Sequence, residues 1–186
     1  MVLGADAYVC LSLSCWWFCI RRHRAPLGAI GLAKPRWASL AAMIPLSIAL
    51  LLANGVLVIF TSAVLDGAQN PQGEALAPSG ILTTQNYVLL FVLIAVIAPL
   101  GEELIFRGML YRFLSAKKGV TFGVVSSAAI FSLAHVVPVL LPSLFLLGVA
   151  LALVTERFQS IYPAVVLHAL NNGISLTILY AASTRM

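Results

Sequence analysis

Charged residues are scarce in this sequence: Asp, Glu, Lys and Arg make up only 9% of its 186 residues, whereas 61% are hydrophobic. Soluble globular domains contain about 25% charged residues, so the composition excludes that class. It is typical of a polytopic membrane protein, with room for about six spans of roughly 20 residues. We therefore expect an all-α fold with a single helical membrane domain over residues 1–186.

Several signatures of other protein classes are also missing. The three cysteines, Cys10, Cys15 and Cys19, give no disulfide framework and lack the spacing of metal ligands. There is no His-Glu-x-x-His element and no Gly-x-Ser-x-Gly turn. The net charge of +5 is explained by loops near anionic lipid. We accordingly expect no nucleic-acid partner.

Apolar runs predict six membrane-spanning helices. A polar segment at 66–86, which contains no Lys or Arg, is expected to be an exposed loop, and 138–142 a tight turn. The fifth predicted span is short for a full crossing. The six predicted spans cover residues 2–20, 37–65, about 87–114, 119–137, 143–155 and 161 to the C-terminus.

The distribution of Lys and Arg predicts the orientation in the membrane. A basic cluster at 21–24 follows the first apolar run instead of preceding it, which indicates a membrane anchor and not a cleavable signal peptide. With that cluster in the cytoplasm, alternation of the spans places every Lys and Arg except Arg185 on the cytoplasmic side. We expect an integral membrane protein with its N-terminus outside.

Pairs of residues four positions apart, all polar except Phe131, occur within three of these predicted helices. Residues at this spacing share a helix face, and ionisable groups at bilayer depth are costly unless they face a cavity or one another. The sequence therefore predicts one buried polar site between the third, fourth and sixth helices. Its candidate residues are Glu102, Glu103 and Arg107, then Phe131 and His135, then His168 and Asn172.

On the first of these helices, the two neighbouring acids are expected to have different roles. Glu103 and Arg107 have the spacing and order of a helical ion pair, and Glu102 is turned about 100° away from it. A carboxylate without such a partner suits a general base that takes a proton from water. Pro99 and Gly101 either loosen this helix for water or substrate, or are simply tolerated in a membrane helix.

The other two faces carry histidines. His135 taken alone is typical of a hydrogen-bond bridge between helices. His168 and Asn172 offer an imidazole and an amide that can stabilise an oxyanion or hold a water. Together with Glu102 they favour a catalytic site over a polar packing network. His135, His168 and Glu102 would equally form a His₂Glu zinc set with one open position.

These motifs resemble those of the CPBP intramembrane proteases, a family that includes CAAX-prenyl endopeptidases and bacterial enzymes linked to bacteriocin processing or self-immunity. That family has Glu-Glu-x-x-x-Arg, Phe-x-x-x-His and His-x-x-x-Asn or Asp, in this order. The present chain has Glu102-Glu103-Leu-Ile-Phe-Arg107, Phe131-Ser-Leu-Ala-His135 and His168-Ala-Leu-Asn-Asn172, all within residues 99–173.

The resemblance implies hydrolysis of a peptide bond inside the membrane, without a metal or other cofactor. In that scheme Glu102 activates water, His135 positions it, His168 and Asn172 stabilise the oxyanion, and Glu103 with Arg107 holds the site together. The implied substrate is a membrane-embedded or lipid-anchored peptide or protein, handled by a bacterial-type member in the cytoplasmic membrane. Prenyl-CAAX cleavage and zinc-dependent proteolysis stay open as alternatives.

Two non-proteolytic classes compete with this interpretation. A membrane immunity or partner-binding protein would keep the fold and its polar network for packing alone. A small transporter would relay protons through carboxylates and histidines near the midplane, but it would be expected to show repeated halves or paired broken helices. Neither feature is evident in the sequence.

Overall fold

In the computed structural model, residue 17 and residues 26–66 and 82–184 are described, and helices are the only regular elements in this part of the chain. The predicted all-α fold class is therefore confirmed. Several sequence-based predictions lie outside the described residues. They concern the first span apart from Trp17, the basic cluster at 21–24, the three cysteines, most of the loop at 66–86, and Arg185.

The segment predicted as the second span is helical as expected. Helices α2 (Trp37–Ala41) and α3 (Met43–Val64) together form a candidate span of 28 residues. The interruption lies at Ala42, three residues before Pro45, which has no N–H to continue the ladder of hydrogen bonds. Ahead of α2, the short 3₁₀ helix η2 (Leu27–Ile30) ends at Gly31 with a positive φ of 79°.

The third predicted span is one long helix of 35 residues, from Thr84 to Lys118. The hydroxyl of Thr83 caps its start by accepting from the Asn86 N–H, and Gly119, with a φ of +87°, ends it. The helix is longer than the predicted 87–114 at both ends. It consists of α5 (Thr84–Leu90), the π-helix η3 (Phe91–Ile97), α6 (Ala98–Glu103), the π-helix η4 (Leu104–Tyr111) and α7 (Arg112–Lys118).

The fourth and fifth predicted spans need correction. Helix α8 (Val120–Ala134) has 15 residues and is about 22 Å long, shorter than a hydrocarbon core of about 30 Å. The fifth span is longer than predicted, because η5 (Pro138–Leu140) and α9 (Leu141–Phe158) form a 21-residue candidate span. Pro142 lies in the first turn of α9, where its missing N–H is tolerated, so the predicted turn at 138–142 is helical.

The last helix, α10 (Tyr162–Ser183), matches the predicted sixth span. Four helices in the described part of the chain are thus long and apolar enough to cross a membrane, and α8 is a shorter apolar one. Exposed side chains on α3 are large and apolar, as lipid-facing residues are. They include Ile48, Leu52, Val56, Ile59 and Phe60.

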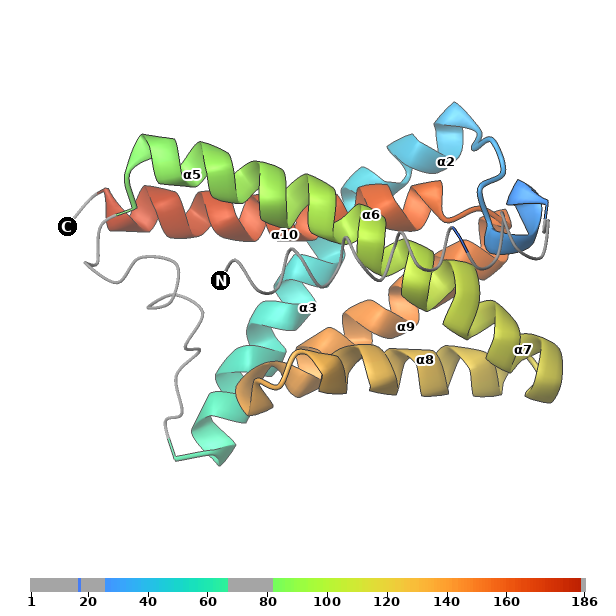
Figure 1. Ribbon diagram of the computed structural model, residues 1–186. Coiled ribbons are helices and arrows are strands. Elements are labelled where there is room, and N and C mark those ends of the chain that lie inside the picture. Colours follow the sequence, from blue (N-terminus) through green and yellow to red (C-terminus); the bar gives the residue numbers. More distant parts are fainter. Residues whose placement is uncertain (1–16, 18–25, 67–81, 185–186) are drawn as a thin grey trace.

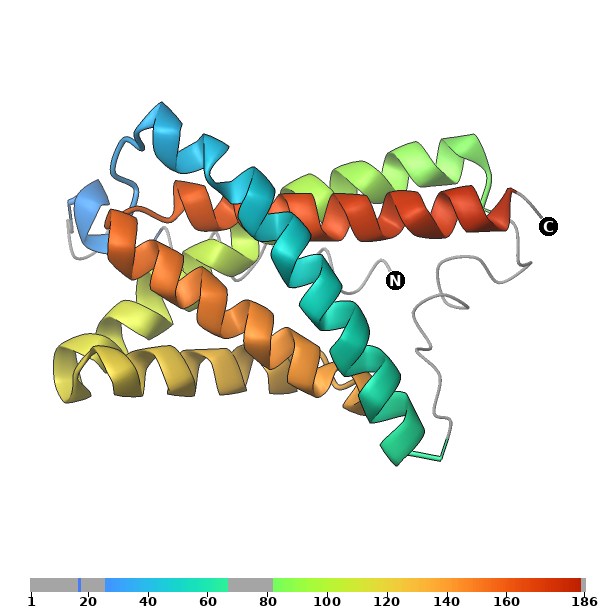
Figure 2. The same cartoon turned by 180° about the vertical axis from the view of Figure 1, so that it is seen from behind.

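The helices cross one another instead of forming a parallel bundle. Figures 1 and 2 show α10 lying beside the first half of the long helix, α8 beside α9, and α3 crossing both α9 and α10. The main apolar core lies at that crossing and combines residues of α3, α9 and α10. Its buried members are Met43, Leu50, Leu147, Leu151, Val154, Ala164 and Leu167.

Candidate active site

The two acids of the predicted site lie in the middle of the long helix, where its hydrogen-bond pattern changes twice. Helix α6, which carries Glu102 and Glu103, is flanked on both sides by π-helical segments. Pro99 at its start removes one backbone donor, which explains why a regular α-helix is not maintained there. Single π-turns are frequent at functional sites. Both glutamates are buried, with Glu102 only 5% exposed.

Glu103 and Arg107 form the predicted ion pair, completely buried. Nη1 of Arg107 donates to Oε1 of Glu103 at 3.0 Å, and Nη2 donates to the backbone carbonyl of Gly148 in α9 at 3.2 Å. The guanidinium carbon also lies 4.4 Å from the centre of the Phe131 ring in α8. One side chain therefore connects the long helix to both α8 and α9.

His168 joins α10 to the same carboxylate. Its Nδ1 lies 2.8 Å from Oε1 of Glu103, and because a carboxylate can only accept, the imidazole donates from Nδ1. The other ring nitrogen, Nε2, faces Oε2 of Glu102 at 3.8 Å, beyond hydrogen-bonding distance. The bond to Glu103 thus fixes which edge of the ring faces Glu102.

Glu102 differs from its neighbour in having no such partner. Its Oε2 is buried and accepts no hydrogen bond from the described residues. Unsatisfied buried carboxylate oxygens are costly, so this atom is either strained or available to a small polar molecule. The two neighbouring acids thus lie in different environments, because Glu103 is bonded to Arg107 and His168 and Glu102 is not.

The aromatic ring of Phe131 is packed between the polar groups of the site. It is fully buried and meets the imidazoles of His135 and His168 at centroid distances of 4.8 and 5.7 Å. His135, at the end of α8, is half-buried, and its Nδ1 donates to the Phe131 carbonyl at 2.8 Å. Its Nε2 is then the acceptor nitrogen of the neutral ring.

Asn172 lies one turn beyond His168 on α10, but its amide is engaged elsewhere. Nδ2 donates to the backbone carbonyl of Ile94, in η3, at 3.0 Å. The structure therefore bonds Glu103 to Arg107 and His168 and places Glu102 next to them. His135 and Asn172 are bonded elsewhere, the first to its own helix and the second to η3.

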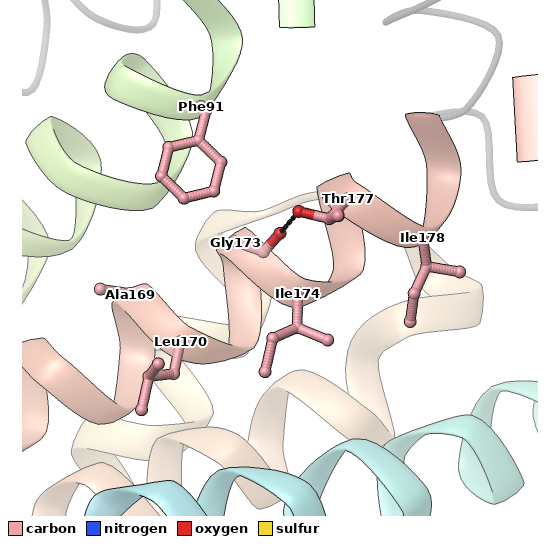
Figure 3. A pocket seen from close by; sticks show the side chains of 7 residues that line it. All are labelled: Phe91, Ala169, Leu170, Gly173, Ile174, Thr177 and Ile178. Atoms are coloured by element: carbon pink, nitrogen blue, oxygen red, sulfur yellow. Dashed lines mark hydrogen bonds between the residues drawn. The ribbon is translucent and has the colours of Figure 1, made fainter. Parts of the chain in front are cut away.

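An apolar groove is present on α10, the helix that carries His168 and Asn172. It has a volume of about 290 Å³ and runs along α10, starting at Ala169 and Gly173, which adjoin His168 and Asn172 in sequence. Figure 3 shows Phe91 extending toward α10 from the neighbouring helix. The side chain of Thr177 donates to the Gly173 carbonyl at 2.7 Å and so keeps its polar oxygen satisfied. The remaining lining residues are Leu170, Ile174 and Ile178.

The zinc alternative requires its three ligands to surround one metal position. In the described residues, no three His, Cys, Asp or Glu side chains come close enough together to hold a metal ion. The required set, Glu102, His135 and His168, does not form such a group. His168 faces Glu102, while His135 bonds to its own helix.

Two contributions to the site could not be predicted from the sequence, because both come from backbone atoms. They are the carbonyls of Gly148 and Ile94, which accept from Arg107 and Asn172. Residue type carries no signal for a backbone acceptor. Pro99 removes the donor to the Ile94 carbonyl only with the five-residue spacing of η3, which the sequence did not predict.

Comparison with known proteins finds a matching family. Residues 84–174 match the model of a family described as "Type II CAAX prenyl endopeptidase Rce1-like". The matched range contains all seven candidate residues and extends from the start of α5 into α10. No curated protein and no solved structure matches the chain.

Proposed function

Residues 84–174 belong to the family of Rce1-like type II CAAX prenyl endopeptidases, and from this premise we propose that the chain hydrolyses a peptide bond in a membrane-associated substrate through a water molecule activated by Glu102. The coarse part of this assignment, a membrane endopeptidase, follows from the family and from the four long apolar helices. The residue roles below are our proposal.

One observation carries the mechanism: the buried, unpartnered Oε2 of Glu102 beside Nε2 of His168. An unpaired carboxylate oxygen can accept a hydrogen bond from water and then take its proton. Oε2 of Glu103 also accepts no hydrogen bond from the described residues, but the carboxylate of Glu103 is held through Oε1 by both Arg107 and His168. We therefore assign the role of base to Glu102, which has no such bond.

The charges of the buried cluster support a second role, for His168. Two carboxylates and one guanidinium leave one negative charge unbalanced, and buried charges are stable only when paired. In the scheme we propose, the Nε2 of His168, which faces Glu102 at 3.8 Å, carries a proton during the reaction. That N–H is a donor for the oxyanion of the tetrahedral intermediate. The proton that Glu102 removes from water then passes to the leaving amine.

His135 and Asn172 complete the proposed site. Since Nδ1 of His135 donates to the Phe131 carbonyl, its Nε2 can accept from the attacking water and orient it. The amide of Asn172 has two N–H groups, one of which serves the Ile94 carbonyl. The second is a candidate donor to the oxyanion, together with His168.

The substrate class we propose is a peptide anchored in the membrane by an apolar or lipidated segment. Two features support it: the family description, which names CAAX prenyl endopeptidases, and the apolar groove along α10, whose lining residue Ala169 follows His168 in the sequence. A groove of about 290 Å³ with an almost entirely apolar lining suits hydrocarbon and not a hydrophilic peptide.

The test is cleavage of a panel of membrane-embedded peptide reporters, some ending in a prenylated CAAX sequence, in liposomes. Wild type and Glu102→Gln are each assayed with and without a strong chelator. Glu102-activated water predicts that the variant loses at least a hundredfold in rate and that the chelator has no effect. Loss of activity with the chelator and its return with zinc would assign a metalloprotease instead. Equal rates for wild type and variant would refute the role of Glu102.

The same variant addresses the immunity or scaffold alternative. If Glu102→Gln leaves the abundance of the protein and its biological effect unchanged, the polar cluster serves packing and the catalytic proposal fails. Glu103→Gln cannot replace it in this experiment, because Glu103 holds two other side chains and its loss would also affect folding.

A further inference from the structure

The hydrogen bond between Asn172 and the Ile94 carbonyl occurs where the long helix lacks a donor of its own. In η3 the N–H of Ala98 donates to the carbonyl of Leu93, five residues back. The same spacing one residue later would take the N–H of residue 99 to Ile94, but residue 99 is proline and has no N–H. The side chain of Asn172 supplies a donor to this carbonyl at 3.0 Å.

The surrounding packing is built for close contact between the two helices. Gly173, next to Asn172, lies against η3 so tightly that a Cβ there would meet the Phe91 ring at 3.1 Å and the Cβ of Ala95 at 3.4 Å. Pro99 is itself fully buried. The bond is therefore not an exposed contact that water replaces at no cost.

The position of this bond relates it to the proposed chemistry. Asn172 lies one helical turn from His168, and Pro99 lies three residues before Glu102. His168 and Glu102 face each other at 3.8 Å, so a shift of α10 along the long helix changes the distance between the two groups. A displacement of about 1 Å at a catalytic site costs on the order of a hundredfold in rate.

We propose that Pro99 and Asn172 act as a pair of positioning residues. Pro99 leaves the Ile94 carbonyl without a donor in its own helix, Asn172 supplies the missing N–H from α10, and the resulting bond sets His168 opposite Glu102. This inference rests on the proposed function for its effect on catalysis. The pairing itself is a property of the fold and can be tested without catalysis.

The experiment is a double-mutant cycle with Pro99→Ala, Asn172→Ala and the double variant, each measured for thermal unfolding in detergent and for cleavage kinetics. Alanine at position 99 restores a backbone N–H within reach of the Ile94 carbonyl. We expect Asn172→Ala to lower the unfolding midpoint and to reduce kcat about a hundredfold with little change in KM. Relative to Asn172→Ala, the double variant should regain most of the lost unfolding temperature and show a kcat at least tenfold higher.

The matched control is the neighbouring Asn171. Its Nδ2 donates to Ser47 in α3 at 3.0 Å and to the Leu167 carbonyl, so it faces a different helix. Pro99→Ala should not improve Asn171→Ala in either measurement. This control separates repair of the Ile94 bond from a general stabilisation of the long helix by alanine.

Each result decides between distinct roles. Additive effects of Pro99→Ala and Asn172→Ala on the midpoint would overturn the pairing. A recovered midpoint with an unrecovered kcat would overturn the positioning role and leave Asn172 as a direct oxyanion donor. If wild type cleaves no reporter while the midpoints still show the coupling, the proposed function fails but the pairing stands.

Discussion

Nδ1 of His168 donates a hydrogen bond to Oε1 of Glu103 at 2.8 Å, although 65 residues separate the two in the chain. Because Arg107 donates to the same oxygen, one carboxylate orients both the guanidinium and the imidazole. The adjacent Glu102 is left facing the opposite edge of the imidazole at 3.8 Å. Two neighbouring acids in one helix thus have different environments. The roles that we propose, a base for Glu102 and a structural partner for Glu103, follow from that difference.

Substitution of the two acids should therefore have different consequences for stability. Glu103→Gln leaves Arg107 buried without a counter-charge, which costs about 3–5 kcal/mol of unfolding free energy. Glu102→Gln removes a carboxylate whose Oε2 accepts no hydrogen bond from the described residues, so we expect a smaller loss of stability than for Glu103→Gln. Unfolding titrations of both variants in mixed micelles measure the difference. Equal losses would mean that the two acids share one structural role.

Replacing Arg107 by lysine should show that geometry matters there as well as charge. Lysine keeps the positive charge but cannot reproduce the fixed arrangement of donors that reaches Glu103 and Gly148 together. We expect a loss of about 2 kcal/mol, from one buried acceptor left unsatisfied, in the same unfolding titration. Arg157→Lys, at an exposed position, is the control and should stay within about 0.5 kcal/mol of wild type.

The sequence predicted the all-α class, the Glu103–Arg107 pair and the long helices 37–65 and 161 onward, because these follow from composition and from i, i+4 spacing. It did not predict the extent of α8 and α9. Val136, with a φ of 54°, ends the regular backbone before Pro138, and such a conformation has no signal in a β-branched residue. Contacts to backbone atoms, such as Arg107 with Gly148, were equally invisible to residue patterns.

Gly148 should tolerate no larger residue, because α8 and α9 are in contact there. A Cβ at this position would meet both Cα and Cβ of Ala128 at 3.0 Å. We expect Gly148→Val to separate the two helices, to move the carbonyl that Arg107 binds, and to lower stability by about 1–3 kcal/mol. Cleavage should fall with it.

Gly55 provides the matched control for that substitution. It lies within α3, and a Cβ there would have nothing within 4 Å. Gly55→Val should therefore leave both the unfolding transition and the cleavage rate close to those of wild type. If the two valine variants behave alike, the close approach of α8 and α9 at Gly148 is not what the site depends on.

We expect Phe131 to stabilise the protein through the contacts of its aromatic ring and not through the volume of its side chain. The ring lies 4.4 Å from the Arg107 guanidinium carbon and contacts the edge of Phe106 at a centroid distance of 5.2 Å. Aromatic pairs contribute about 0.5–1.5 kcal/mol each, and a desolvated cation–π contact about 2 kcal/mol. Phe131→Leu keeps an apolar side chain but loses both kinds of contact, so we expect a loss of about 2–3 kcal/mol.

The same ring also touches the two histidines of the site, which makes its effect on activity separable from its effect on stability. We expect Phe131→Leu to reduce the cleavage rate of the folded fraction about tenfold, since His135 and His168 each lose the surface that limits their rotation. Phe113→Leu is the control: its ring is 55% exposed and is approached only by Lys117 among the cation–π contacts of the described residues. If folded Phe131→Leu cleaves at the same rate as the control, the ring serves only to fill the core. The orientation of His168 would then depend on Glu103 alone, and that of His135 on the Phe131 carbonyl alone.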